Sequence, residues 1–180
     1  LPTDQPSDRP PVHPSILLGV DAGGSHTTAA IARPDLTVLA RADGPGTPLR
    51  PGAAAATAAT VAEVATRAAR SAGIPLPADR AVVGAAGAGR ALERRELRDA
   101  IAAHGLARSL EVVPDGEIAL AAAFGTEPGI LINAGTGSIA YARDRSGRLR
   151  RSGGYGWQFS DEGGGYWDST NSVWRYDWTQ

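Results

Sequence analysis

The chain has 180 residues, 42% of them hydrophobic and 21% charged, with a net charge of −1 and no cysteine. This charge balance excludes a broadly basic surface for nucleic acid or for an acidic membrane, and no apolar run is long enough to span a bilayer. The lack of cysteine excludes disulfides, thiolate metal sites and thiol nucleophiles. The lack of lysine excludes a P-loop, which needs that residue.

The first half of the chain predicts a strand meander followed by a helix. Residues 1–14 are rich in proline and are expected to form a disordered lead. Three strands joined by short turns are expected at 15–24, 25–34 and 36–43, with a Gly- and Pro-rich loop at 44–52. The segment 53–73 predicts a helix, because Val61, Val64, Ala65 and Ala68 recur at helical spacing and Gly73 supplies a stop.

The remaining elements alternate between strands and helices. Helices are expected at 90–105, with Gly105 as its cap, and at 116–125. Strands are expected at 80–87, 110–115, 129–135 and 138–144, and a turn at 145–148. A meander followed by helical crossovers predicts an α/β fold with a mixed sheet and helices over it.

The segment 129–144, GILINAGTGSIAYARD, matches a loose dinucleotide fingerprint through Gly135, Gly137 and Ala140. Such a fingerprint needs a helix after the glycines to hold the pyrophosphate. The residues from Ser138 onward alternate as a strand instead, and a turn arrives too early for a helix. The motif is therefore interpreted as a strand, a glycine turn and a second strand.

The segment 19–31, GVDAGGSHTTAAI, has the same form. Glycine-rich hairpin tips leave backbone N–H groups accessible, and such concavities bind phosphate. The candidate phosphate ligands at the two tips are Gly23, Gly24, Ser25, Gly135, Thr136, Gly137 and Ser138. Asp21, at the end of the first strand, could hold Mg²⁺ through water. The alternative is that both tips are ordinary glycine hairpins.

Asp115 follows a predicted strand and precedes a predicted helix, where active-site side chains collect in α/β proteins. As a general base it would take the proton of an attacking hydroxyl in phosphoryl transfer. The alternative is a helix N-cap, for which aspartate is favoured.

Four segments in this order resemble the N-acetylglucosamine kinase and BadF/BadG/BcrA/BcrD-type ATPase group, within the superfamily of sugar kinases, actin and chaperone ATPases. They are GVDAGGSHTTAAI, VVPDGEIALAAAFG, GILINAGTGSIAYAR and GGYGWQFSDEGGGYW. The resemblance implies a ribonuclease-H-like, actin-like lobe that binds ATP and Mg²⁺, with Asp115 as the base. It also implies a sugar site, at Gly154, Tyr155, Gly156, Asp161 and, at the position of a sugar-binding Asn, Thr47.

The resemblance covers residues 15–167 as an incomplete family domain and leaves 168–180 as a tail outside it. It implies ATP-dependent phosphorylation of an amino sugar, N-acetylglucosamine or glucosamine, by a cytoplasmic protein of which this chain is a truncated N-terminal part. A composition rich in Ala, Arg and Gly without Lys suggests a bacterial source. A homodimer of the full-length protein is compatible with the resemblance. The alternatives are a non-catalytic sugar- or nucleotide-binding fragment and an ATPase without a sugar acceptor. Dehydratase activators of this group hold an iron–sulfur cluster through cysteine, which this chain lacks. The kinase branch is therefore favoured.

Overall fold

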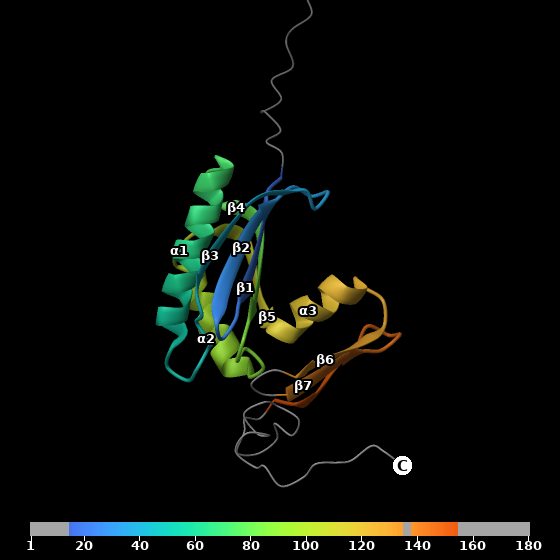
Figure 1. The fold of residues 1–180 in the computed structure, drawn as a ribbon. Coiled ribbons are helices and arrows are strands. Elements are labelled where there is room, and N and C mark those ends of the chain that lie inside the picture. The colour runs from blue at the N-terminus through green and yellow to red at the C-terminus, as the bar shows by residue number, and fades with distance from the viewer. Residues whose placement is uncertain (1–14, 135–137, 155–180) are drawn as a thin grey trace, which may run out of the picture. The chain divides into compact units, whose positions relative to one another are not determined.

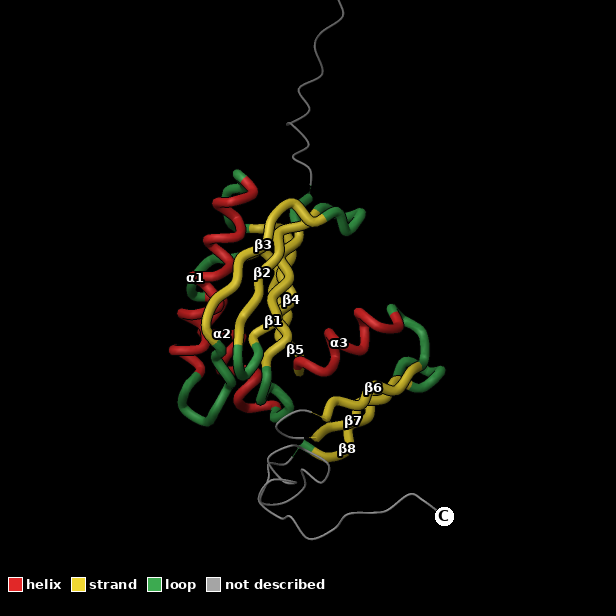
Figure 2. Tube along the Cα trace, viewed as in Figure 1, coloured by secondary structure: helices red, strands yellow, loops and turns green. Residues whose placement is uncertain are grey.

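The computed structural model describes residues 15–134 and 138–154, and the chain divides into two compact units, Leu1–Val113 and Pro114–Gln180 (Figure 1). Each unit has a β-sheet of its own (Figure 2).

The first unit is built on a five-stranded sheet in the order β3-β2-β1-β4-β5. The strands are β1 (Leu17–Ala22), β2 (His26–Ala32), β3 (Val38–Pro45), β4 (Ala78–Ala85) and β5 (Ala107–Pro114). The strands β1, β2 and β3 form an antiparallel meander, whereas β4 runs parallel to β1. The sheet is therefore mixed, and β1 and β4 end at the same edge.

Helices α1 (Ala54–Ala72) and α2 (Ala91–Ala102) pack against each other on one face of this sheet (Figure 1). The predicted stripe of Val61, Val64, Ala65 and Ala68 is fully buried. On the strands, alternate residues face these helices; in β1 they are Leu18, Val20 and Ala22. The alternate residues of the strands and the helix residues at helical spacing therefore pack together in one apolar core.

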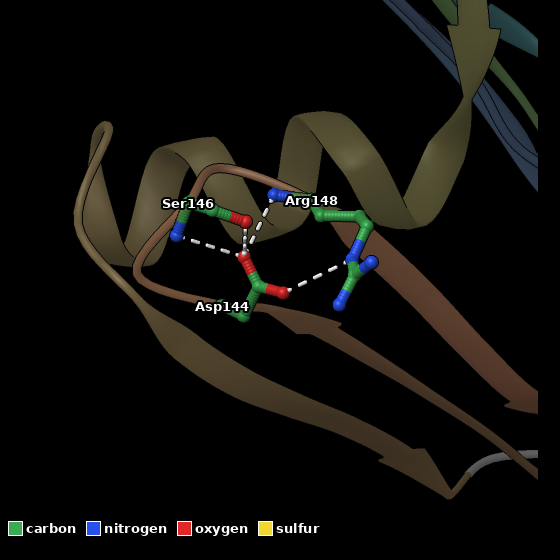
Figure 3. Close-up of polar contacts among 3 residues, drawn as sticks. All are labelled: Asp144, Ser146 and Arg148. Carbon is green, nitrogen blue, oxygen red and sulfur yellow. Dashed lines mark hydrogen bonds and ion pairs between the residues drawn. The ribbon is translucent and has the colours of Figure 1, made fainter.

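The second unit holds α3 (Asp115–Phe124) and a three-stranded antiparallel sheet, β6 (Gly129–Ala134), β7 (Ser138–Arg143) and β8 (Leu149–Gly153), with β7 in the centre. The turn between β7 and β8 is held by Asp144, whose Oδ1 accepts hydrogen bonds from the backbone N–H groups of Ser146 and Arg148 and from the Ser146 hydroxyl (Figure 3).

The predicted mixed sheet is confirmed for the first five strands, and the last three strands form a separate sheet that includes an additional strand, β8. Gly73 ends α1 as expected, with a left-handed φ of 67° and an N–H directed at the carbonyls of Ala69 and Arg70. The expected cap at Gly105 is wrong. Helix α2 ends at Ala102 with Ala103 as its C-cap, and the left-handed turn comes two residues later.

Candidate active site

The first glycine tip, Gly23–Ser25, connects β1 to β2. The backbone N–H of Gly23 donates to the carbonyl of His26 at 2.9 Å and closes the turn. Gly24 and Ser25 are exposed, and a methyl group built on Gly24 would meet open space. The backbone at this tip is accessible to a ligand, as a phosphate site requires.

The chain leaving β3 holds this tip in place. The N–H of Thr47 donates to the carbonyl of Gly23 at 2.9 Å. A methyl group on Gly46 would overlap the backbone of Gly24 and Ser25, so only glycine allows this approach. Thr47, expected at the sugar site, therefore lies beside the first glycine tip. Gly46 was missed by sequence reasoning, although its place between two prolines marks an unusual backbone.

The same loop continues across the ends of β1 and β4. The N–H of Leu49 donates to the carbonyl of Ala86 at 2.8 Å, and the N–H of Ala86 donates to the carbonyl of Ala22 at 2.9 Å. Gly87, at a φ of 91°, packs so closely on Leu49 that a side chain there would overlap its carbonyl. The carboxyl ends of parallel strands are where α/β folds bind ligands.

Asp21 lies on β1, opposite Thr28 of β2 and Gly84 of β4, and is exposed. Among residues 15–134 and 138–154, no three carboxylate or histidine side chains gather into a metal-binding group. Mg²⁺ in kinases is usually held by one or two carboxylates, substrate phosphates and water. Asp21 is an exposed carboxylate near the end of β1, just before the glycine tip, and it fits that pattern.

Asp115 is the first residue of α3, and the N-cap position belongs to Pro114. The alternative reading of Asp115 as the N-cap is therefore wrong by one position. Its Oδ1 accepts a hydrogen bond from the N–H of Gly116 at 2.9 Å. Asp115 and Glu117 both lie in the first turn, where the helix dipole favours negative charge.

The ring of Tyr141 of β7 lies against Gly116, next to Asp115, and the Asp115 side chain acts on the Tyr141 hydroxyl by its charge and as a hydrogen-bond partner. Burial raises the pKa of the Tyr141 hydroxyl, and the negative charge of Asp115 raises it further. Sequence reasoning did not single out Tyr141, because alternation gives the side of the strand on which it lies and not the helix that it contacts.

Ser138 and Gly154 also lie together. The N–H of Gly154 donates to the carbonyl of Ser138 at 3.0 Å, and Gly154 has a φ of 70°. The other predicted site residues lie outside the described part of the chain: Gly135, Thr136, Gly137, Tyr155, Gly156 and Asp161.

Residues 18–172 match the sequence profile of the BadF/BadG/BcrA/BcrD ATPase family. The chain belongs to this family. The matched residues include the antiparallel meander that opens the mixed sheet and its glycine tip.

This family member is 34% identical over 151 residues to the N-acetylmuramic acid/N-acetylglucosamine kinase of Clostridium acetobutylicum, an alignment covering 83% of this chain and 49% of the relative. A solved structure from Chromobacterium violaceum, assigned as an N-acetylglucosamine kinase, is 30% identical with a TM-score of 0.74, covering 88% of this chain and 55% of the other. A protein from Porphyromonas gingivalis with the same assignment shares the fold, with a TM-score of 0.65 at 23% identity, covering 82% of this chain and 51% of the other. The chain thus spans about half the length of these relatives.

Proposed function

We propose that this chain supplies the general base and the phosphate-binding hairpins of an ATP-dependent kinase that phosphorylates an amino sugar. The observation that carries the proposal is the 34% identity to a kinase named for N-acetylmuramic acid and N-acetylglucosamine. The exposed Gly24 and Ser25 of the first tip and the placement of Asp115 in the first turn of α3 support it.

In this mechanism Asp115 accepts the proton of a sugar hydroxyl as that oxygen attacks the γ-phosphorus of ATP. The bond between the γ-phosphorus and the bridging oxygen breaks, and ADP leaves with the electron pair. The products are a sugar phosphate, ADP and one proton, which Asp115 then returns to solvent. A general base of this kind contributes a factor of about 10² to 10⁴ in rate.

The backbone N–H groups of Gly24 and Ser25 would donate to the ATP phosphates, and Thr136 and Ser138 of the second tip would do the same. Mg²⁺, held by Asp21 through water, would neutralise charge on the phosphates. Gly154, Tyr155, Gly156 and Asp161 would line the sugar pocket. Thr47 would reach the sugar from beside the first tip, since its backbone already bonds to Gly23.

The wider setting belongs to the same proposal. Residues 15–167 would be the family part of the chain and 168–180 a tail outside it. Within the described residues, no helix combines the length and apolar character needed to cross a membrane, and we infer that the kinase works in the cytoplasm on a small sugar.

The test is a kinase assay on two proteins. One is the 180-residue chain, and the other is a chimaera in which this chain replaces the matching half of the Clostridium acetobutylicum kinase. ADP release and phosphorylated sugar are measured with N-acetylglucosamine, glucosamine and N-acetylmuramic acid as acceptors. The folded chimaera is expected to phosphorylate an amino sugar, and Asp115→Asn should lower kcat by about 10² or more while sugar binding remains.

The matched control is Glu117→Gln, which changes a carboxylate in the same helical turn and should leave kcat within about threefold. Unchanged turnover in Asp115→Asn would contradict the assigned base. Release of ADP without a sugar phosphate would favour an ATPase without a sugar acceptor. A folded chimaera that binds neither ATP nor sugar would overturn the proposal in favour of a non-catalytic chain.

A further inference from the structure

Tyr141 lies in the middle of the second unit. It is on the central strand β7, paired with Leu131 of β6 and with Arg151 of β8, and only 6% of its surface is exposed. Burial of a tyrosine removes its hydroxyl from water, so the hydroxyl needs a partner within the protein. That partner is the side chain of Asp115.

The ring of Tyr141 also packs against the first turn of α3. A methyl group built on Gly116 would overlap three atoms of the ring, Cδ2, Cε2 and Cζ. Gly116 is itself buried, and its N–H donates to Oδ1 of Asp115. The absence of a side chain at this one position lets the ring lie against the helix backbone, directly beside the aspartate.

Three charged side chains act on the Tyr141 hydroxyl. The carboxylates of Asp115 and Glu117 on α3 raise its pKa, and the guanidinium of Arg151 on β8 lowers it, while burial raises it most of all. The hydroxyl therefore stays protonated at neutral pH. A protonated tyrosine hydroxyl is the donor toward a carboxylate oxygen, so the tyrosine donates to Asp115.

From this geometry we propose that Tyr141 is the positioning residue for Asp115, holding the carboxylate in the orientation in which it receives the proton of the sugar hydroxyl. The inference rests on the proposed function, because it assumes that Asp115 is the base. The N–H of Gly116 and the hydroxyl of Tyr141 are two donors from a helix and from a neighbouring strand. Together they remove the rotational freedom that an aspartate at the start of a helix would otherwise have.

A merely structural tyrosine would make the same contact, so the first experiment measures the contact and the second measures its effect on catalysis. The 180-residue chain is labelled at the tyrosine Cζ carbons and followed by NMR from pH 7 to 11. It has four tyrosines, and the signal missing from Tyr141→Phe identifies Tyr141.

Asp115→Asn is expected to lower the pKa of Tyr141, and the control Glu117→Gln is expected to lower it less. At pH 7, the Asp115 Cγ resonance is expected to move in Tyr141→Phe. Absence of both changes would overturn the contact.

The second experiment uses the kinase chimaera. Tyr141→Phe keeps the ring and removes the hydroxyl, and it is expected to lower kcat about tenfold or more with KM for ATP and for sugar changed less than about twofold. Tyr141→Ala also removes the packing and is expected to lower the thermal midpoint as well. An unchanged kcat in Tyr141→Phe, with Asp115→Asn inactive, would overturn this inference and leave the proposed function standing. Full turnover in Asp115→Asn would overturn the proposed function, while the NMR result would still report the contact.

Discussion

Thr27 is fully buried, and its hydroxyl donates to the carbonyl of Pro45 at 2.8 Å. This bond joins the first residues of β2 to the last residue of β3, directly below the glycine tip. Among the described residues, no buried side-chain nitrogen or oxygen lacks a hydrogen-bond partner. Single polar contacts therefore connect the strands that carry the site, and each can be tested by a substitution of nearly the same shape.

Thr27→Val should destabilise the chain by about 0.5–1.5 kcal/mol, because it removes the part-buried hydrogen bond from the Thr27 hydroxyl to the carbonyl of Pro45. The measurement is the free energy of unfolding in urea. Thr28→Val is the matched control, since the Thr28 hydroxyl donates at 2.7 Å to Asp43 at an exposed position and its loss should cost less than about 0.5 kcal/mol. Equal losses in the two variants would contradict a larger contribution from the Thr27–Pro45 bond.

We expect the stability of the turn between β7 and β8 to depend on pH through the carboxyl group of Asp144. Its hydrogen bonds with Ser146 and Arg148 lower the pKa of the carboxyl from the usual 3.8 to about 2 (Figure 3). Because the folded pKa lies below the unfolded one, the stabilisation is fully present above pH 4 and is lost as pH falls toward 2. Carboxyl resonances followed by NMR between pH 1 and 6 check this, and a midpoint near the usual value would refute it.

At the scale of elements, the same arrangement of strands and backbone hydrogen bonds occurs twice in the chain. Strands β1–β3 and β6–β8 are both antiparallel meanders, and in each the chain leaving the third strand bonds back to a residue that borders the connection between the first two strands. In the first meander Thr47 bonds to Gly23, and in the second Gly154 bonds to Ser138. The sequence shows no internal repeat, because a meander depends on alternation and turns and not on particular residues.

Gly46→Ala tests the contact between the loop after β3 and the glycine tip of the first meander. The added methyl group would overlap the backbone of Gly24 and Ser25 and force the tip or the loop to move. We expect a loss of about 1–3 kcal/mol in unfolding free energy and weaker nucleotide binding by the chimaera. Gly19→Ala is the matched control, since a methyl group there meets open space and should change stability by less than about 0.5 kcal/mol. A Gly46→Ala chain as stable as Gly19→Ala would show that the tip tolerates rearrangement.

At the scale of the whole molecule, the apolar core belongs to the first unit. The buried cluster runs from Ile16 to Val112. In the described part of the second unit, the buried large apolar side chains are Leu120 and Tyr141, whereas Ile130 and Ile132 are 68% and 74% exposed. Burial of apolar surface is the main favourable term in folding, so stability should be distributed unequally between the two units.

We therefore expect residues 15–113 to fold alone, with cooperative unfolding and a free energy on the order of 5 kcal/mol. In the 180-residue chain, backbone amides of β1, β2 and β4 should exchange with solvent at least about 100-fold more slowly than those of β6–β8. Circular dichroism of the fragment and hydrogen exchange of the full chain are the measurements. Equal protection in the two sheets would mean that the second unit is as stable as the first.

The sequence by itself determined the type and order of nearly every described element and the glycine turn between β1 and β2. It could do so because the periodicity of apolar residues and the positions of glycine act locally. The family profile then matched residues 18–172, the part of the chain in which those local patterns lie. Asp115 could also be located from the sequence, because the end of a strand before a helix is a local feature.

Only the tertiary structure decided what holds these residues. The contacts of Gly46 with Gly24 and Ser25, and of Tyr141 with the first turn of α3, join segments that lie far apart along the chain. The sequence also left open that the last three strands form their own sheet, since hydrophobic alternation specifies which side of a strand is buried and not which strand it pairs with. Pairing and packing are settled by shape complementarity in three dimensions, and the candidate base and its buried tyrosine partner are brought together at that level.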